Sequence, residues 1–193
     1  MRALLIALAM TSSVAAGAPT FAQTLTVNPN LTIDVTGFSG DANTLPEVVS
    51  NLESAMGGRV AAIAFNNVSG TPGYGVILTQ GPNVKFMRLD KPSSQAVEIS
   101  QASIPSWMMT WRNQRRAAVV QAAKVPLADA IRTAEAHQRG APAVVAGIAR
   151  SASNPTSDVH AYMVGILKDG DLRRVAVDSN SGQVIENPSA LAW

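Results

Sequence analysis

The hydrophobic and polar positions along the chain follow two periods. Apolar residues recur at three- and four-residue intervals over 45–56 and again over 127–134, which places them on one side of a helix. Short apolar or alternating runs follow each of these segments, and a period of two is typical of β-strands. The pattern predicts a fold of the α+β class in which helices pack on antiparallel strands.

The same order of elements occurs twice, which indicates an internal repeat. Glu53 of the first copy corresponds to Glu135 of the second, and Tyr74 corresponds to Tyr162. We therefore expect two repeated modules, each a helix packed on a sheet of three or four antiparallel strands, joined by a connecting helix.

Capping residues give the first helix defined ends. Thr44 and Glu47 have the spacing of a capping box, and Pro46 suits the first helical turn. Gly57 follows the last apolar position, where glycine commonly ends a helix. The second helix is expected to begin near Pro126 and to end at a glycine, Gly140.

Two further stretches have a readable pattern. Residues 24–36 alternate like a pair of strands, and we expect them to extend the first sheet. Residues 104–123 lack glycine and are rich in helix formers, so they predict the connecting helix. Its basic residues have helical spacing and are expected on one solvated face: Arg112, Arg115 and Arg116.

These patterns divide the chain into consecutive parts. The expected boundaries are a signal peptide over 1–22, a first module over 23–99, the connecting helix over 100–124, a second module over 125–188 and a tail over 189–193.

The N-terminal residues are typical of an export signal. Arg2 is followed by an apolar run over 3–10, which is shorter than the roughly 20 residues that span a bilayer. Small residues predict cleavage after Ala22, with Ala18 as the alternative site. We expect a periplasmic or secreted protein with no stable membrane insertion once the signal is removed.

Composition excludes several kinds of chemistry. The chain has no cysteine, so disulfides, thiolate metal sites and cysteine nucleophiles are excluded. The formal net charge is only +2, and the basic cluster within 100–124 is too small for a nucleic-acid footprint. We therefore predict no nucleic-acid partner.

No catalytic, cofactor-binding or metal-ligating residues are predicted. The histidines His137 and His160 do not have a metal-binding spacing, and a Gly-x-Ser-x-Gly nucleophile motif is absent. Glu135 stands four residues before Arg139, in the order that favours a pair on a helix surface. We therefore interpret Glu135, like Glu53, as structural, and predict that the protein is not an enzyme and has no cofactor.

The aspartates Asp90 and Asp178 also fit a structural role. Both fall where a strand is expected to give way to a turn. Aspartate at such a position commonly accepts hydrogen bonds from the backbone.

The second copy resembles the PepSY module, which occurs in propeptides of thermolysin-type metalloproteases and in bacterial envelope proteins. The matching features, in chain order, are Pro126–Glu135, Gly140, Tyr162, Lys168–Gly170 and Val175–Ile185. The first copy is a more distant match, because Pro92–Gln95 replaces the terminal Ser-Gly turn.

The resemblance implies export and a role in restraining or binding peptidases. We expect a non-catalytic exported PepSY-domain protein that binds or regulates, for example inhibits, a peptidase or another envelope protein. Contact through an exposed strand edge or through the loops Ser151–His160 and Val68–Gly73 is expected. The alternative is a periplasmic small-ligand binding or sensor protein, with a pocket near Trp107, Trp111 and Tyr162.

Overall fold

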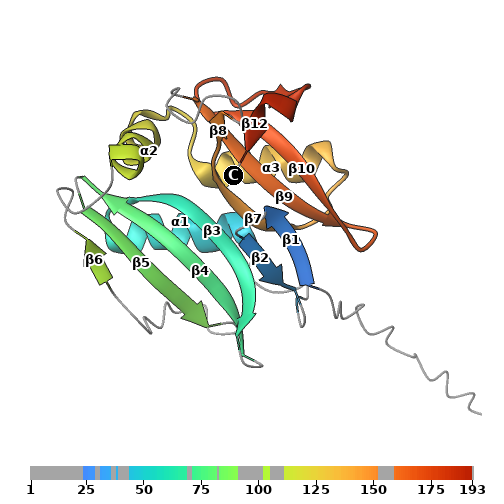
Figure 1. Ribbon diagram of the computed structural model, residues 1–193, viewed down its shortest axis with the longest axis horizontal. Coiled ribbons are helices and arrows are strands. Elements are labelled where there is room, and N and C mark those ends of the chain that lie inside the picture. Colours follow the sequence, from blue (N-terminus) through green and yellow to red (C-terminus); the bar gives the residue numbers. More distant parts are fainter. Residues whose placement is uncertain are drawn as a thin grey trace, which may run out of the picture.

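The computed structural model (Figure 1) describes residues 24–28, 31–35, 38, 44–68, 71–81, 83–90, 102–104, 111–151 and 159–192. The expected signal peptide, 1–22, lies outside these ranges. No helix in the described part of the chain is both long enough and apolar enough to cross a membrane.

The described residues form three α-helices, a main sheet and two small sheets. The helices are α1 (Leu45–Met56), α2 (Trp111–Ala122) and α3 (Leu127–His137), with a short 3-10 helix η2 (Pro188–Ala190) near the C-terminus. The strands of the main sheet are β3 (Arg59–Val68), β4 (Thr71–Gln80), β5 (Asn83–Asp90), β6 (Ala102–Ile104), β7 (Ala143–Ile148), β9 (Ala161–Lys168), β10 (Asp171–Asp178) and β11 (Val184–Ile185). The small sheets pair β1 (Thr24–Asn28) with β2 (Leu31–Asp34), and β8 (Arg150–Ser151) with β12 (Leu191–Ala192).

The main sheet is continuous and antiparallel. Its eight strands lie in the order β11-β10-β9-β7-β3-β4-β5-β6 (Figure 1). At its centre β3 pairs with β7, with Ala62 opposite Gly147 and Ala64 opposite Val145. The prediction of two repeated modules, each with its own helix-covered sheet and joined by a helix, is therefore wrong. One sheet crosses the whole described structure.

The error has a physical cause in the two central strands. All six residues of β7 are buried, and β3 buries Val60, Ala61 and Ile63, with the apolar residues Ala62 and Ala64 half-buried on its other face. Strands that are apolar on both faces belong in the interior of a sheet. The sequence interpretation placed each of them at the start of a separate small sheet, where one face would meet water.

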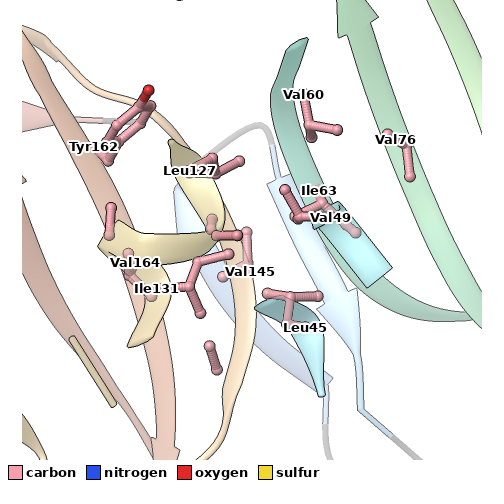
Figure 2. Packing of buried hydrophobic residues seen from close by; sticks show 14 of the residues in the cluster. Leu45, Val49, Val60, Ile63, Val76, Leu127, Ile131, Val145, Tyr162 and Val164 are labelled. Carbon is pink, nitrogen blue, oxygen red and sulfur yellow. The ribbon is translucent and has the colours of Figure 1, made fainter. Parts of the chain in front are cut away.

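One hydrophobic core joins the two halves of the chain. Figure 2 shows Leu45 and Val49 of α1 near Ile63 of β3, with Ile131 of α3 near Val145 of β7. These side chains belong to a single buried cluster, and α1 also contacts α3 directly. Both helices therefore cover the same sheet and share its interior.

The predicted ends of the first helix are confirmed. Thr44 and Glu47 form the capping box, in which the Thr44 N–H donates to Glu47 Oε2 over 3.1 Å. Gly57 ends α1 with φ at 66°, a conformation that glycine adopts without steric strain. The second helix, α3, begins after Pro126 and is followed by a turn that ends at Gly140.

The expected connecting helix is shorter than predicted and has a different role. Ile104 belongs to strand β6, and the helix itself begins only at Trp111. Instead of linking two modules, α2 packs on β3, β4 and β7 of the one sheet. Val120 on its inner side is fully buried, and Gln121 Nε2 donates to Thr79 Oγ1 over 2.8 Å.

The N-terminal strand pair forms as predicted, but it does not extend the main sheet. β1 and β2 make a separate antiparallel sheet. A hydrogen bond from the Asp34 N–H to Asn66 Oδ1, 3.1 Å long, holds β2 beside the end of β3. Phe38 then packs edge-on against Phe65, with ring centroids 5.1 Å apart.

Candidate functional site

Glu53, which the sequence pattern indicates to be a structural residue, has a role in the fold. It lies near the end of α1 and accepts a hydrogen bond from the Val60 N–H over 2.8 Å. Arg59 Nε lies 3.7 Å from the same oxygen. Burial raises the pKa of Glu53, while the Val60 hydrogen bond and the Arg59 charge oppose that rise.

Glu135 makes the corresponding contact in the other half of the chain. It lies near the end of α3 and accepts a hydrogen bond from the Ala143 N–H over 2.9 Å, at the start of β7. Burial raises the pKa of Glu135, opposed mainly by this hydrogen bond. The expected partner, Arg139, lies beyond the end of α3 with φ at 63°. Both glutamates therefore tie a helix to the strand that follows it, through a backbone amide.

Tyr162 lies beside the Glu53–Arg59 pair. It is fully buried, and its hydroxyl donates to the Val125 carbonyl over 3.0 Å. Burial raises the pKa of Tyr162. The charge of Arg59 and its hydrogen bond to the hydroxyl oppose this rise only in part. The cluster links β3, β9 and the segment before α3, so its polar groups connect the two halves of the sheet.

Asp178 organises the turn after β10, as the sequence predicted. Its Oδ1 accepts hydrogen bonds from the Asn180 N–H over 2.9 Å and the Ser181 N–H over 2.7 Å. These bonds, above all that from Ser181, lower the pKa of Asp178. The side chain of Asp90, its expected counterpart, lies outside the described residues.

The two histidines are both exposed, on or near different elements. His137 ends α3, and His160 precedes β9. Within the ranges that the structure describes, no three His, Asp or Glu side chains are grouped as metal ligands.

The loops expected to bind a partner are only partly described. In the first, Val68 pairs with Thr71 and Asn67 with Pro72, so most of Val68–Gly73 belongs to strands rather than to a loop. Its turn, 69–70, and most of Ser151–His160, 152–158, lie outside the described residues.

The residues expected around a ligand pocket are not brought together in the described structure. Trp107 lies outside the described ranges, and Trp111 starts α2 with its side chain also outside them. Tyr162 is buried, with its hydroxyl already bound to Val125. The small-ligand hypothesis remains a prediction from the sequence.

An apolar surface that the sequence interpretation did not single out lies on β3, β4 and β5. Phe86 is 39% exposed. It stands opposite Ile77, which in turn stands opposite Ala62, and both of these are half-buried. We call these three residues the Phe86 face. The neighbouring positions Val76 and Met87 are buried on the opposite side of the sheet, so strand alternation places Phe86 toward solvent.

The alternation of β5 was the available signal for this surface. A period of two places Phe86 on one face with Val84 and Arg88, and Met87 on the other with Leu89, but the sequence does not state which face lies toward the helices. Pairing with β4 decides this, because Leu89 lies opposite the buried Tyr74 and Met87 opposite the buried Val76.

Comparisons with known proteins assign no family. No family model matches the chain, and no curated protein matches it. Among solved structures it is similar to that of a "putative lipoprotein" from Clostridium difficile 630, at 15% sequence identity and a TM-score of 0.44. The match covers 76% of this chain and 93% of that one.

Proposed function

We propose that this chain is a non-catalytic exported protein that binds another protein of the cell envelope, with a peptidase as the first partner to test. The N-terminal signal pattern supports export, with cleavage after Ala22. The resemblance of 125–188 to the PepSY module supports a peptidase as partner. The contacts of Glu53 and Glu135 support a binding role over catalysis, because both carboxylates are engaged with backbone amides of the fold.

The observation that carries the proposal is the exposed ring of Phe86 on a sheet face. Large aromatic side chains in an apolar surrounding are common anchors of protein interfaces. Ile77 and Ala62 extend the apolar surface across two more strands. The ring is held on a paired strand rather than on a free loop, so little conformational entropy is lost when it is buried by a partner. The partner that fits is a protein surface with an apolar pocket for one aromatic ring.

The proposal is tested by capture from periplasmic and culture-supernatant extracts. The tagged chain, in the form recovered after export, is compared with its Phe86→Ala variant, and bound proteins are identified by mass spectrometry. We expect the wild-type chain to retain a partner that Phe86→Ala loses. Any peptidase captured is then assayed with and without the added chain, and its activity is expected to fall.

A matched control removes an apolar side chain elsewhere. Leu191 is half-buried in β12, and Leu191→Ala is expected to retain the same partner as wild type. Thermal unfolding of both variants checks that they remain folded. Capture of the same proteins by wild type and by folded Phe86→Ala would refute the Phe86 face as the binding surface.

A further inference from the structure

One side of β10 has no strand paired with it over more than half of its length. β10 pairs with β9 over all eight of its residues, but with β11 only at Ala176 and Val177. No described strand pairs with the other side of Asp171–Val175. In Figure 1 this half of β10 lies at the boundary of the sheet, on the side away from β9. We call Asp171–Val175 the open edge.

Hydrogen bonds nearby show which backbone groups point to the open edge. The Leu167 N–H donates to the Pro142 carbonyl over 2.9 Å, which lies on the β7 side of β9. In an antiparallel strand the N–H and C=O of one residue point to the same side, so Leu167 directs both away from β10. Its opposite residue, Leu172, consequently directs its own N–H and C=O to the open edge.

Two opposite charges flank Leu172 on the strand. Asp171 and Arg173 lie on the same face of β10, and their side chains are 72% and 57% exposed. Within one chain, Arg173 Nη2 lies 3.6 Å from Asp171 Oδ2. If a second copy of the strand lies antiparallel to the first with the two Leu172 residues opposite one another, each Asp171 lies opposite the Arg173 of the other copy. The sequence of the strand is therefore complementary to itself in charge.

We propose that two copies of this chain associate through the open edge, about a two-fold axis at Leu172. The two Leu172 residues exchange N–H···O=C hydrogen bonds, and Asp171 of each copy lies opposite Arg173 of the other. Residues that flank a hydrogen-bonded pair have their side chains closer together than the pair itself, which favours the two cross-strand ion pairs. The two main sheets then form one sheet across the dimer.

The charges select this register over its neighbours. A two-fold axis at Arg173 places Arg173 opposite itself, and an axis at Asp171 places Asp171 opposite itself, and both arrangements are repulsive. With the axis at Leu172, Arg174 lies opposite Gly170, which has no side chain to obstruct it. The interface is isologous, so one strand supplies both halves of every contact.

Charge reversal tests the register. Sedimentation velocity over a range of concentrations is expected to show a monomer–dimer equilibrium for the exported wild-type chain. Asp171→Arg and Arg173→Asp each place like charges opposite one another twice, and each is expected to weaken the dimer by at least about tenfold. An equimolar mixture of the two variants is expected to form a heterodimer, because one chain then carries two bases and the other two acids.

Cysteine cross-linking provides a second measurement that does not depend on charge. The chain has no cysteine of its own. Hydrogen-bonded antiparallel pairs have Cα atoms about 5.5 Å apart, within the range of a disulfide, so Leu172→Cys is expected to form a covalent dimer on mild oxidation. The matched control is Arg174→Cys on the same strand, whose two copies are displaced by about 13 Å along the strand and are expected not to cross-link.

The dimer and the Phe86 face are separate, and their tests fail separately. Phe86→Ala is expected to dimerise like wild type, and Arg173→Asp is expected to capture the same partner protein as wild type. A wild-type chain that stays monomeric at every concentration overturns the dimer. So does failure of the two charge variants to associate when mixed, or equal cross-linking of the two cysteine variants.

Discussion

At the scale of single residues, the two glutamates have the same role in different elements. Glu53 and Glu135 each accept a hydrogen bond from a buried backbone N–H at the start of the strand that follows their helix. The sequence allowed their structural role to be predicted, because they occupy equivalent positions in the two halves. The donors of these hydrogen bonds could not be predicted, because the chain makes a turn between each glutamate and the backbone N–H that it binds. Helical spacing indicates only partners on the same helix or just beyond it, such as Arg139.

Removing the Glu135 side chain tests this contact. Glu135→Ala leaves the N–H of Ala143 without its partner, and Ala143 is only 2% exposed. A buried donor without a partner typically lowers stability by about 1–3 kcal/mol. We expect a loss of that size in urea unfolding. The control, Arg132→Ala, removes a side chain that is 52% exposed, and it is expected to change stability by less than about 0.5 kcal/mol.

The raised pKa of Glu135 gives the protein a pH dependence of defined sign. A carboxyl whose pKa is higher in the folded state favours the protonated form there, so stability falls as pH rises from the ordinary glutamate pKa of 4.5 through the folded pKa. Glu135→Gln keeps an oxygen that can accept from the Ala143 N–H but does not titrate. We expect its melting temperature to fall less between pH 4.5 and 7 than that of wild type.

Other groups contribute to the same profile, so the comparison must be with wild type. Glu53 has a raised pKa and acts in the same direction. Asp178 has a lowered pKa, so its stabilising effect is lost only as pH falls through its folded value, below 3.8. Parallel melting curves for wild type and Glu135→Gln across pH 4.5–7 would contradict the assignment to Glu135.

At the scale of elements, the ends of a helix could be predicted from the sequence more reliably than the pairing of strands. The ends of α1 follow from Thr44, Glu47 and Gly57, because a cap depends on residues within one turn. The composition of 104–123 predicts a helix that includes Ile104, but this residue lies in β6, opposite Val84. Ile104 forms part of a strand because it pairs with β5, which lies outside the segment 104–123. The composition of that segment does not indicate the pairing.

The contact between β3 and β7 can be tested through a glycine. A Cβ at Gly147 would lie 3.0 Å from the Cβ of Ala62 and 3.2 Å from the Ala61 carbonyl oxygen, both on β3. Gly147→Val is therefore expected to force the central strands apart and lower stability by at least about 1–3 kcal/mol. Gly75→Ala is the control, because no atom lies within 4 Å of a Cβ there, and it is expected to unfold like wild type. Equal stability of both variants would contradict the close approach of the strands.

At the scale of the whole molecule, the sheet and the core cross the boundary that the sequence repeat indicated. Figure 2 shows core residues from both halves packed together, and Leu127 among them is fully buried. The repeat correctly directs attention to a helix followed by strands in each half, but similarity between two halves does not say whether they pair. That depends on which strand edges meet, and β3 and β7 meet.

A shared core predicts that the described structure unfolds in one step. Calorimetry at concentrations where the chain is monomeric is expected to give one transition with equal calorimetric and van't Hoff enthalpies, where two separate modules would give two. Leu127→Ala removes a fully buried side chain, and it is expected to lower stability by about 2–5 kcal/mol. Hydrogen exchange should then speed up in β4 as well as in β9. Acceleration confined to β9 and its neighbours would indicate two independent units.

The pairing of β3 with β7 also has a consequence for the order of folding. Ala62 meets Gly147 only after the chain between them has emerged, so the middle of the sheet closes late in a chain that is delivered N-terminus first. Until then β3 presents an unpaired, apolar edge, which is the kind of surface that aggregates or is held by chaperones. The sequence-distant contact slows folding. A chain cut short before β7 would carry that exposed edge permanently.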